Sequence, residues 1–325
     1  MNTLIHKKEK KGLLMEVIYL HHPYAVNQIK KEPVVLAMGF FDGVHAGHRM
    51  VIKRAAEEAK KRGIKLAVLT YDHHPSIVFK TYNKPLTYLT RLPKKLALLA
   101  ELGVDLTYVV NFTSEFAQLT PQIFVDQYMF GLHAEAVVAG FDHTYGPKNA
   151  DMKHLPQYAQ SRFDVIEVQQ VNVDGKESAS TTARKMVDEG RLDTLTHLLM
   201  RPYETTGLIV HGEARGRELG YPTANIETTP GERLPGVGVY VVEMKIDQTW
   251  YPGMASIGYN VTFGENRPKT VEINLFNFSR AIYGENVQIK WHHYLRGEVK
   301  FNNVQELIDQ LAEDEKEAQA FLLNL

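Results

Sequence analysis

The first half of the chain alternates short apolar runs with stretches in which apolar residues recur at helical spacing. The apolar runs predict strands at 34–38, 64–70, 104–110, 136–139 and 165–171. The helical spacing predicts helices that begin near Arg49, Pro93 and Pro121 and that end at Gly63, Gly103 and Gly131. Repeated strand–helix–strand units of this length favour an α/β domain in which helices cover both faces of a parallel sheet.

The pattern changes between His197 and Tyr203. From there to about Phe301, apolar runs are separated by turns rich in glycine and proline, which is typical of a compact β-barrel. The predicted strands are 206–210, 237–246, 251–257, 270–278 and 287–295. The last segment, from Val304, has an apolar stripe with Glu and Asp opposite it, and so predicts a packed amphipathic C-terminal helix. A helix that binds a partner is the alternative.

Composition and charge narrow the classes of function. The chain has 325 residues, which favours two domains, with 37 Lys and Arg against 38 Asp and Glu. This balance argues against a nucleic-acid or membrane partner, because no net basic field would attract either. The absence of cysteine excludes disulfides and thiolate sites and fits a cytoplasmic protein. Residues 1–15 are expected to form a flexible extension, with Met15 as an alternative start.

The stretch GFFDGVHAGH, residues 39–48, lies between a predicted strand and a predicted helix. His45 and His48 therefore fall at a helix N-terminus, where free backbone N–H groups and the helix dipole favour an anion such as a nucleotide phosphate. Two imidazoles at this position can donate hydrogen bonds to the negative charge that develops during phosphoryl or nucleotidyl transfer. A structural turn and half of a zinc site are the alternatives, although the chain has neither cysteine nor an H-E-x-x-H helix.

Three further features are candidates for chemistry. Ser180, Thr181 and Arg184 lie where a helix at 183–190 is expected to open, although the residues alone favour a plain N-cap as the role of the hydroxyls. The stretch 211–225 combines spaced glycines with Thr-x-Asn but is neither a P-loop nor a dinucleotide fingerprint, so its composition supports only a glycine-rich anion loop. Glu272 interrupts a strand pattern and faces either solvent or a pocket.

The strings themselves resemble one known family. GFFDGVHAGH resembles the G-x-F-D-G-x-H-x-G-H signature of HxGH nucleotidyltransferases, in the form used by prokaryotic bifunctional riboflavin kinase/FAD synthetases. The string SASTTAR resembles that family's I-S-S-T-x-x-R, and 211–225 resembles its G-x-x-x-G-R-x-x-G-x-P-T-A-N. Residues 294–301 resemble its closing R-x-E-x-x-F. The resemblance covers nearly all of residues 16–325.

The resemblance implies a Rossmann-like HxGH nucleotidyltransferase domain at 16–200 and a riboflavin-kinase β-barrel with a terminal α-helix at 201–325. The kinase would use ATP and Mg²⁺ to convert riboflavin to FMN, and the first domain would transfer AMP from ATP to FMN, giving FAD and pyrophosphate. The expected substrates are small molecules, and a weak homo-oligomer is a further expectation. The alternatives are a divergent paralogue that keeps one activity and a flavin-binding accessory protein.

The resemblance also implies residue roles. The catalytic residues would be His45, His48, Arg184 and Glu272, with Glu272 as the general base. ATP or phosphate would be bound by Gly39, Phe40, Asp42, Gly43, Gly47, Ser180, Thr181, Gly212, Gly216 and Gly220. Flavin would be bound by Asp72, His74, Asp142, Arg296 and Glu298, and Mg²⁺ by Thr223 and Asn225. Trp291 and Tyr294 could stack on an isoalloxazine or pack in the core.

The chain departs from the family pattern at several positions. Thr144 stands where the family has a basic residue, and Ala150 replaces a glycine. On the kinase side Val261 replaces a proline and Asn274 replaces a histidine. These departures suggest a divergent copy in which one activity is weak.

Overall fold

The computed structural model describes residues 15–146, 149–169, 179–212, 216, 219–259 and 269–325. All but Met15 of the expected N-terminal extension lies outside the described residues. The chain divides by packing into two units. The first comprises the described residues of 1–86 and 90–176, and the second those of 87–89 and 177–325.

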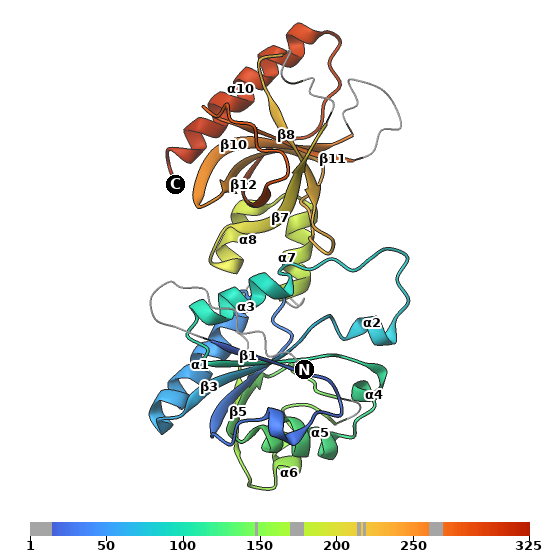
Figure 1. The fold of residues 1–325 in the computed structure, drawn as a ribbon, viewed down its shortest axis with the longest axis vertical. Coiled ribbons are helices and arrows are strands. Elements are labelled where there is room, and N and C mark those ends of the chain that lie inside the picture. The colour runs from blue at the N-terminus through green and yellow to red at the C-terminus, as the bar shows by residue number, and fades with distance from the viewer. Residues whose placement is uncertain (1–14, 147–148, 170–178, 213–215, 217–218, 260–268) are drawn as a thin grey trace. The chain divides into compact units, whose positions relative to one another are not determined.

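The first unit contains a parallel sheet with the strand order β1-β4-β3-β2-β5-β6 (Figure 1). The strands are β1 (Glu16–Leu20), β2 (Val34–Met38), β3 (Lys65–Tyr71), β4 (Leu106–Val110), β5 (Ala134–Gly140) and β6 (Asp164–Val168). Every strand predicted for this half is present, within a few residues of its expected bounds. The sequence analysis missed β1, a short strand that pairs with β4 at the edge of the sheet.

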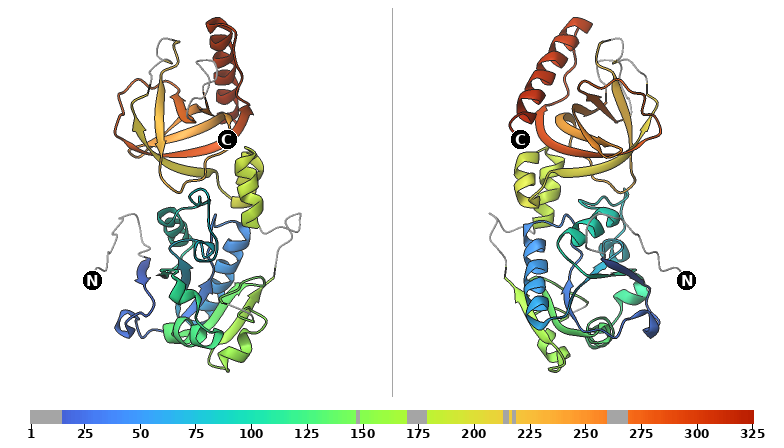
Figure 2. Two further views of the ribbon diagram at one scale, coloured as in Figure 1. Left: turned by 90° about the vertical axis from the view of Figure 1, so that its right-hand side faces the viewer. Right: turned by 60° about the vertical axis from the view of Figure 1, so that its left-hand side comes forward.

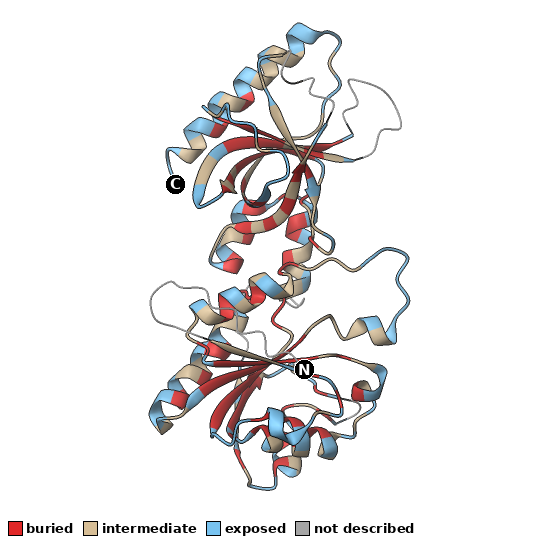
Figure 3. Ribbon diagram, in the orientation of Figure 1, coloured by how far each residue is buried: buried red, intermediate tan, exposed pale blue. Residues whose placement is uncertain are grey.

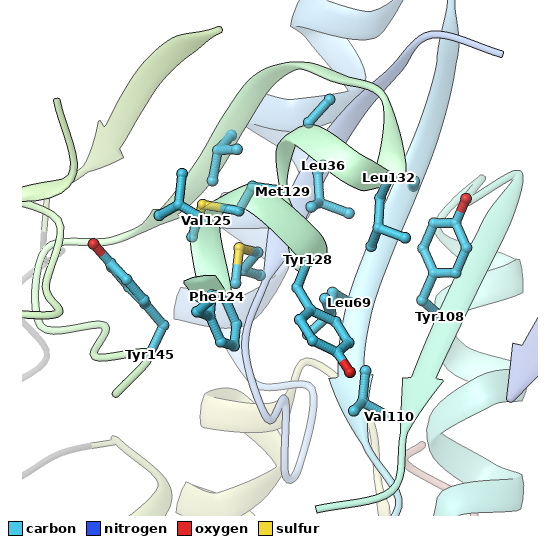
Figure 4. Close-up of a cluster of buried hydrophobic side chains, with 14 of the residues drawn as sticks. Leu36, Leu69, Tyr108, Val110, Phe124, Val125, Tyr128, Met129, Leu132 and Tyr145 are labelled. Atoms are coloured by element: carbon cyan, nitrogen blue, oxygen red, sulfur yellow. The ribbon is translucent and has the colours of Figure 1, made fainter. Parts of the chain in front are cut away.

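Helices cover both faces of this sheet, as expected. The helices are α1 (Ala46–Arg62), α2 (Ser76–Phe79), α3 (Leu92–Glu101), α4 (Ser114–Ala117), α5 (Pro121–Tyr128) and α6 (Leu155–Ala159), with 3-10 turns η1 (Val26–Gln28) and η2 (Phe130–Leu132). Alternate residues of β2 enter different clusters: Val35 packs with residues of α1, and Leu36 packs with residues of α5. Figure 4 shows the second cluster, in which Phe124 and Tyr128 are gathered with Leu69.

One predicted helix end was wrong. Helix α5 ends at Tyr128, and Gly131 lies inside η2 instead of ending a helix. The left-handed position that closes η2 is taken by His133, with φ 61°. Gly131 has a different role, because a Cβ there would lie 2.9 Å from the Asp126 carbonyl oxygen.

The second unit contains a closed antiparallel barrel with the strand order β10-β11-β8-β7-β12-β9. The strands are β7 (Tyr203–Val210), β8 (Thr223–Thr228), β9 (Gly238–Ile246), β10 (Thr249–Gly258), β11 (Thr270–Leu275) and β12 (Asn286–Arg296). The barrel prediction is confirmed. The strands of the barrel contain many of the buried residues of this unit (Figure 3). The missed strand is β8, which contains the Thr-x-Asn sequence.

Three helices accompany the barrel in the described part of this unit: α7 (Ala179–Asp188), α8 (Leu192–Leu199) and α10 (Val304–Leu322). Side chains of α7 and α8 belong to the barrel's own hydrophobic cluster, so packing assigns 177–200 to the second unit. Helix α10 lies along the outside of the barrel (Figure 2), where Ala318 packs against Val241 and Met254. The prediction of a packed amphipathic C-terminal helix is confirmed.

Candidate active sites

The loop after β2 is held in a strained shape by its own apolar side chains. Phe41 and Val44 adopt positive φ angles of 56° and 43°, which non-glycine residues rarely do. Both side chains are fully buried, with at most 1% of their surface exposed, and Phe41 belongs to the cluster under α1. Burial therefore fixes the unusual backbone, and Gly43 supplies a third positive φ of 86°.

The structure brings His45 and His48 together at the N-terminus of α1. His45 is the N-cap, and its Nδ1 accepts a hydrogen bond from the backbone N–H of His48. The two imidazole rings stack with centroids 3.6 Å apart, and the ring of Phe41 meets His48 edge-on at 5.2 Å. Two imidazoles and the first amides of a 17-residue helix thus share one end of the helix, an arrangement suited to binding and stabilising phosphate charge.

Two buried polar side chains hold this loop in place through hydrogen bonds. Asp42 is buried, and its Oδ1 accepts a hydrogen bond from the Thr90 backbone N–H at 3.0 Å. Lys95 of α3 is also buried, and its Nζ donates to the Phe40 carbonyl oxygen at 2.9 Å. The sequence analysis missed Lys95, although a usable signal exists: Lys95 lies on the same helical stripe as Leu98 and Leu99.

The second candidate site is formed by residues of the paired strands β8 and β11. Asn225 lies opposite Glu272 in the ladder, and Thr223 lies opposite Asn274. The Thr223 hydroxyl donates a hydrogen bond of 3.1 Å to the Glu272 carboxylate. Three residues that the sequence separates by up to 49 positions thus meet on one patch of the barrel wall.

The glycines before β8 are required by close approach. A Cβ on Gly212 would lie 2.1 Å from Asn225 Nδ2, so the Asn225 side chain occupies the space that any other residue would fill. A Cβ on Gly216 would lie 2.1 Å from the Tyr221 carbonyl oxygen. Gly220 has a φ of 81°. Residues 213–215 and 217–218 lie outside the described residues.

The hydroxyls of the third candidate lie within a helix and not before it. Helix α7 is described from Ala179, so Ser180 and Thr181 fall in the helix, and Arg184 lies further along it. The three residues belong to the second unit, whereas His45 and His48 belong to the first.

Comparisons with known proteins agree over almost the whole chain. Residues 27–182 match the FAD synthetase family model, and residues 199–322 match the riboflavin kinase family model. A bifunctional riboflavin kinase/FMN adenylyltransferase of Listeria monocytogenes is 45% identical over 312 residues, which cover 96% of this chain and 99% of the relative. The protein of the same name from Bacillus subtilis is 37% identical, with the same coverage. The chain belongs to the bifunctional riboflavin kinase/FMN adenylyltransferase family.

A solved structure agrees with this assignment of fold. A crystal structure titled as a macrolide-efflux protein from Streptococcus pneumoniae is 34% identical, with a TM-score of 0.85, and covers 93% of this chain and 98% of its own. In the part of this family member that the structure describes, no helix combines the length and apolar character that a membrane crossing needs.

The residues expected to bind flavin in the first unit follow the carboxyl ends of its strands. Asp72, after β3, accepts hydrogen bonds from the backbone N–H groups of His73 and Phe112, at 2.9 and 3.1 Å. His74 Nδ1 accepts from the Ser76 N–H, and Asp142 is exposed after β5. Asp72 thus joins two loops at the edge where parallel sheets bind ligands, and a flavin contact for these residues stays a prediction.

In the barrel unit, the residues expected to bind flavin have partners within the fold. Arg296 makes a bidentate ion pair with Asp314 of α10, with N–O distances of 2.8 and 2.6 Å. The Glu298 carboxylate accepts a hydrogen bond from the Tyr259 N–H at 2.9 Å. A Cβ on Gly258 would lie 2.6 Å from Glu298 Oε1, so a larger residue there would displace this carboxylate.

The aromatic candidates differ from each other. Trp291 has no exposed surface, and its Nε1 donates to the Thr205 hydroxyl at 2.8 Å. Core packing is therefore the correct interpretation of Trp291. Tyr294 is only partly buried and meets Tyr240 edge-on at 5.4 Å.

Two departures from the family pattern have a local structural explanation. Ala150 is buried, and its carbonyl accepts a hydrogen bond from the Tyr145 N–H, while the positive φ of 66° falls on the neighbouring Asn149. Asn274 donates a hydrogen bond of 2.8 Å to the Pro222 carbonyl, next to Thr223. Thr144 forms a bridge with Asp151, and Val261 lies outside the described residues.

Proposed function

We propose that this family member phosphorylates riboflavin to FMN and adenylylates FMN to FAD. The observation that carries the proposal is the meeting of Thr223, Asn225 and Glu272 in one patch, in a chain that also pairs His45 with His48 at a helix N-terminus. Matches to both family domains support the same conclusion.

In the kinase reaction Glu272 accepts the proton of the riboflavin 5′-hydroxyl. The hydroxyl oxygen attacks the γ-phosphorus of ATP, and the bond between that phosphorus and the ADP oxygen breaks. Glu272 is suited to this role because it lies beside Thr223 and Asn225, the residues proposed to hold Mg²⁺. The absence of a side chain at Gly212 leaves room for the Asn225 side chain.

The donor set fits a Mg²⁺ ion. In the described residues no group of three or more carboxylates and imidazoles could hold a metal, and a Mg²⁺ that binds with nucleotide phosphates needs only one or two protein oxygens. The proton of the Thr223 hydroxyl is directed at Glu272, so the oxygen lone pairs are available to a cation, and Asn225 offers a carbonyl oxygen. When bound there with ATP, the ion neutralises phosphate charge.

In the adenylyltransferase reaction an FMN phosphate oxygen attacks the α-phosphorus of ATP, and pyrophosphate leaves. The chain needs no nucleophile of its own for this step. The imidazoles of His45 and His48 and the amides of α1 stabilise the charge that develops. Ser180, Thr181 and Arg184 are proposed to hold the triphosphate.

The remaining expectations about this chain are part of the same proposal. Its partners are the small-molecule substrates, with a weak homo-oligomer as a further possibility and the cytoplasm as its location. The functional domains are proposed as 16–200 and 201–325. This functional division differs from the packing division, because α7 carries a nucleotide signature and yet packs with the barrel.

The test is to incubate the purified chain with ATP, Mg²⁺ and either riboflavin or FMN, and to separate the flavins by chromatography. We expect FMN and FAD from riboflavin, and FAD and pyrophosphate from FMN. Failure to form FMN would refute the kinase assignment, and failure to form FAD from FMN would refute the adenylyltransferase assignment. Loss of one activity alone would identify a divergent paralogue.

A further inference from the structure

Lys95 is a buried cation that the proposed reactions do not use. Only 2% of its surface is exposed, although it belongs to a charged residue type that is seldom fully buried without a partner. No carboxylate accepts a hydrogen bond from it among those described. Instead its Nζ donates to three neutral oxygens: the carbonyls of Phe40 and Tyr71, at 2.9 and 3.0 Å, and the Thr70 hydroxyl, at 3.0 Å.

These three bonds match the three N–H groups of an ammonium. The Thr70 hydroxyl in turn donates to the Phe40 carbonyl at 3.0 Å, so Lys95, Thr70 and Phe40 form a closed set of hydrogen bonds. The set joins the carboxyl ends of the neighbouring strands β2 and β3, the edge where a parallel sheet binds its ligand.

Lys95 also acts on the ring of Phe40. Its Nζ lies 4.3 Å from the ring centroid, within the range of a cation–π interaction. The next residue is the strained Phe41, whose ring packs against His48. Lys95 therefore contacts both the backbone carbonyl and the ring of Phe40, the residue at the start of the loop that carries the two histidines.

Lys95 changes between its charged and neutral forms near neutral pH. Burial lowers its pKa to about 7, while the negative charges of Asp42, after β2, and Asp72, after β3, act in the opposite direction. Burial raises the pKa of Tyr71, so that hydroxyl stays neutral, and the His74 imidazole meets Phe40 edge-on at 4.9 Å. A polyanion arriving at this edge of the sheet would favour the protonated lysine.

From this geometry we infer that Lys95 is a positioning residue of the FMN adenylyltransferase, whose ammonium holds the Phe40–Phe41 turn under the two histidines and adds positive potential where ATP phosphate binds. The inference rests on the proposed function. It assigns Lys95 no contact with substrate.

The test compares Lys95→Met with the wild-type chain in FMN adenylylation from pH 6 to 9. Methionine keeps the length of the side chain and removes its charge and donors. We expect kcat/KM to fall about 10- to 100-fold at pH 6, the size expected for buried charged hydrogen bonds. The ratio of wild type to variant should then decrease by up to about tenfold per pH unit above pH 7, because the wild-type lysine itself loses its charge.

The ratio isolates Lys95 because the titrations of the histidines and of the substrates affect both proteins. A lysine that acts through the packing of its side chain alone, and not through its ammonium, would give a ratio that does not change with pH, and that result would overturn the inference. Because the kinase site lies in the other unit, folding of the sheet unit in each variant is checked by far-UV circular dichroism and thermal unfolding of the whole chain. Lys60→Met, at an exposed lysine near the end of α1, removes the same charge and should leave the ratio near one.

A second variant keeps the test decisive if Lys95→Met does not fold. Thr70→Val preserves shape and removes one acceptor of the ammonium, so the alkaline decline of adenylylation should move to lower pH. A decline that stays in place would contradict the inference. If the wild-type chain forms no FAD from FMN, both the proposed adenylyltransferase function and this inference are wrong. If the enzyme is active and the ratio does not depend on pH, only the inference is wrong.

Discussion

The two candidate sites are stabilised in opposite ways. The loop of the sheet unit is strained and is held from inside: Phe41 and Val44 keep positive φ angles because their side chains are buried, and Asp42 and Lys95 anchor it with hydrogen bonds. The polar patch of the barrel unit is held by strand register, which places Asn225 opposite Glu272 in a regular ladder.

This difference predicts different responses to mutation. A loop held by burial loses its shape when an anchor inside the unit is removed, even though the anchor touches no substrate. A patch held by strand register keeps its geometry when one polar side chain is changed, so that substitution removes chemistry and little else. Variants at the two sites can therefore separate positioning from chemistry.

The sharpest test of the register-held site is Glu272→Gln. The amide cannot take the proton of the attacking hydroxyl, and the backbone ladder does not depend on the side chain. We expect riboflavin phosphorylation to fall by about 10²–10⁴, with FAD formation from FMN unchanged. Both rates are measured by flavin chromatography. Glu227→Gln, at an exposed glutamate of β8, is the matched control and should keep both activities; equal losses in the two variants would contradict the role of Glu272.

A second test removes the ion pair between the barrel and α10. In Arg296→Met the Asp314 carboxylate, only 2% exposed, loses its bidentate partner, and we expect the free energy of unfolding to fall by about 3–5 kcal/mol. Both tryptophans, Trp250 and Trp291, belong to the second unit, so tryptophan fluorescence in urea reports that unit alone.

The double variant Arg296→Met/Asp314→Leu should recover most of that stability, because no buried charge is left unpaired. Flavin binding by the double variant then separates the predicted flavin contact of Arg296 from its structural role. A single variant as stable as the wild type would show that the ion pair does not hold α10.

The counterpart in the sheet unit is His48→Ala. Loss of one imidazole beside the helix amides should lower FMN adenylylation by about 10²–10³, while riboflavin kinase activity is spared. If this single change removed both activities in a folded protein, the proposal of two independent sites would be wrong. Compared with Lys95→Met, its effect should be larger at pH 8, where the wild-type lysine has already lost most of its charge.

The sequence predicted regular features well and buried polar ones poorly. The strands of the sheet and most of the barrel follow from their apolar runs, and the motif residues at 39–48 lie where the pattern expects a strand to meet a helix. Strand β8 was missed because TANIET has only two apolar residues, Ala224 and Ile226, too few for a recognisable apolar run. The bond between Thr223 and Glu272 depends on the pairing of strands far apart in the chain, which no local pattern contains.

Lys95 and Asp314 were missed for one shared reason. Amphipathic patterns place charged residues on the solvent face, and both residues lie on the packed face of a helix. Their partners, strand-end oxygens for Lys95 and Arg296 for Asp314, come from other elements. A charged residue on an apolar stripe is thus a signal that sequence analysis can use, although it does not name the partner.

The smallest expected effect concerns a buried base in the barrel, the counterpart of Lys95 in the sheet unit. His292 is buried next to Trp291, and burial lowers its pKa below the ordinary value near 6.5, although the Glu243 carboxylate 3.0 Å away acts in the opposite direction. Between the folded and unfolded pKa values the unfolded chain binds more protons, so the free energy of unfolding rises with pH across that window.

The contribution of neutral His292 is therefore complete above about pH 6.5 and is lost as the pH falls through the folded pKa. We expect urea unfolding curves, followed by tryptophan fluorescence, to show a wild-type barrel unit that loses more stability between pH 7 and 5 than His292→Gln does. The variant keeps the acidic groups that also titrate in this range, so only the difference between the two proteins belongs to His292. Parallel curves would mean that folding does not change the proton affinity of His292.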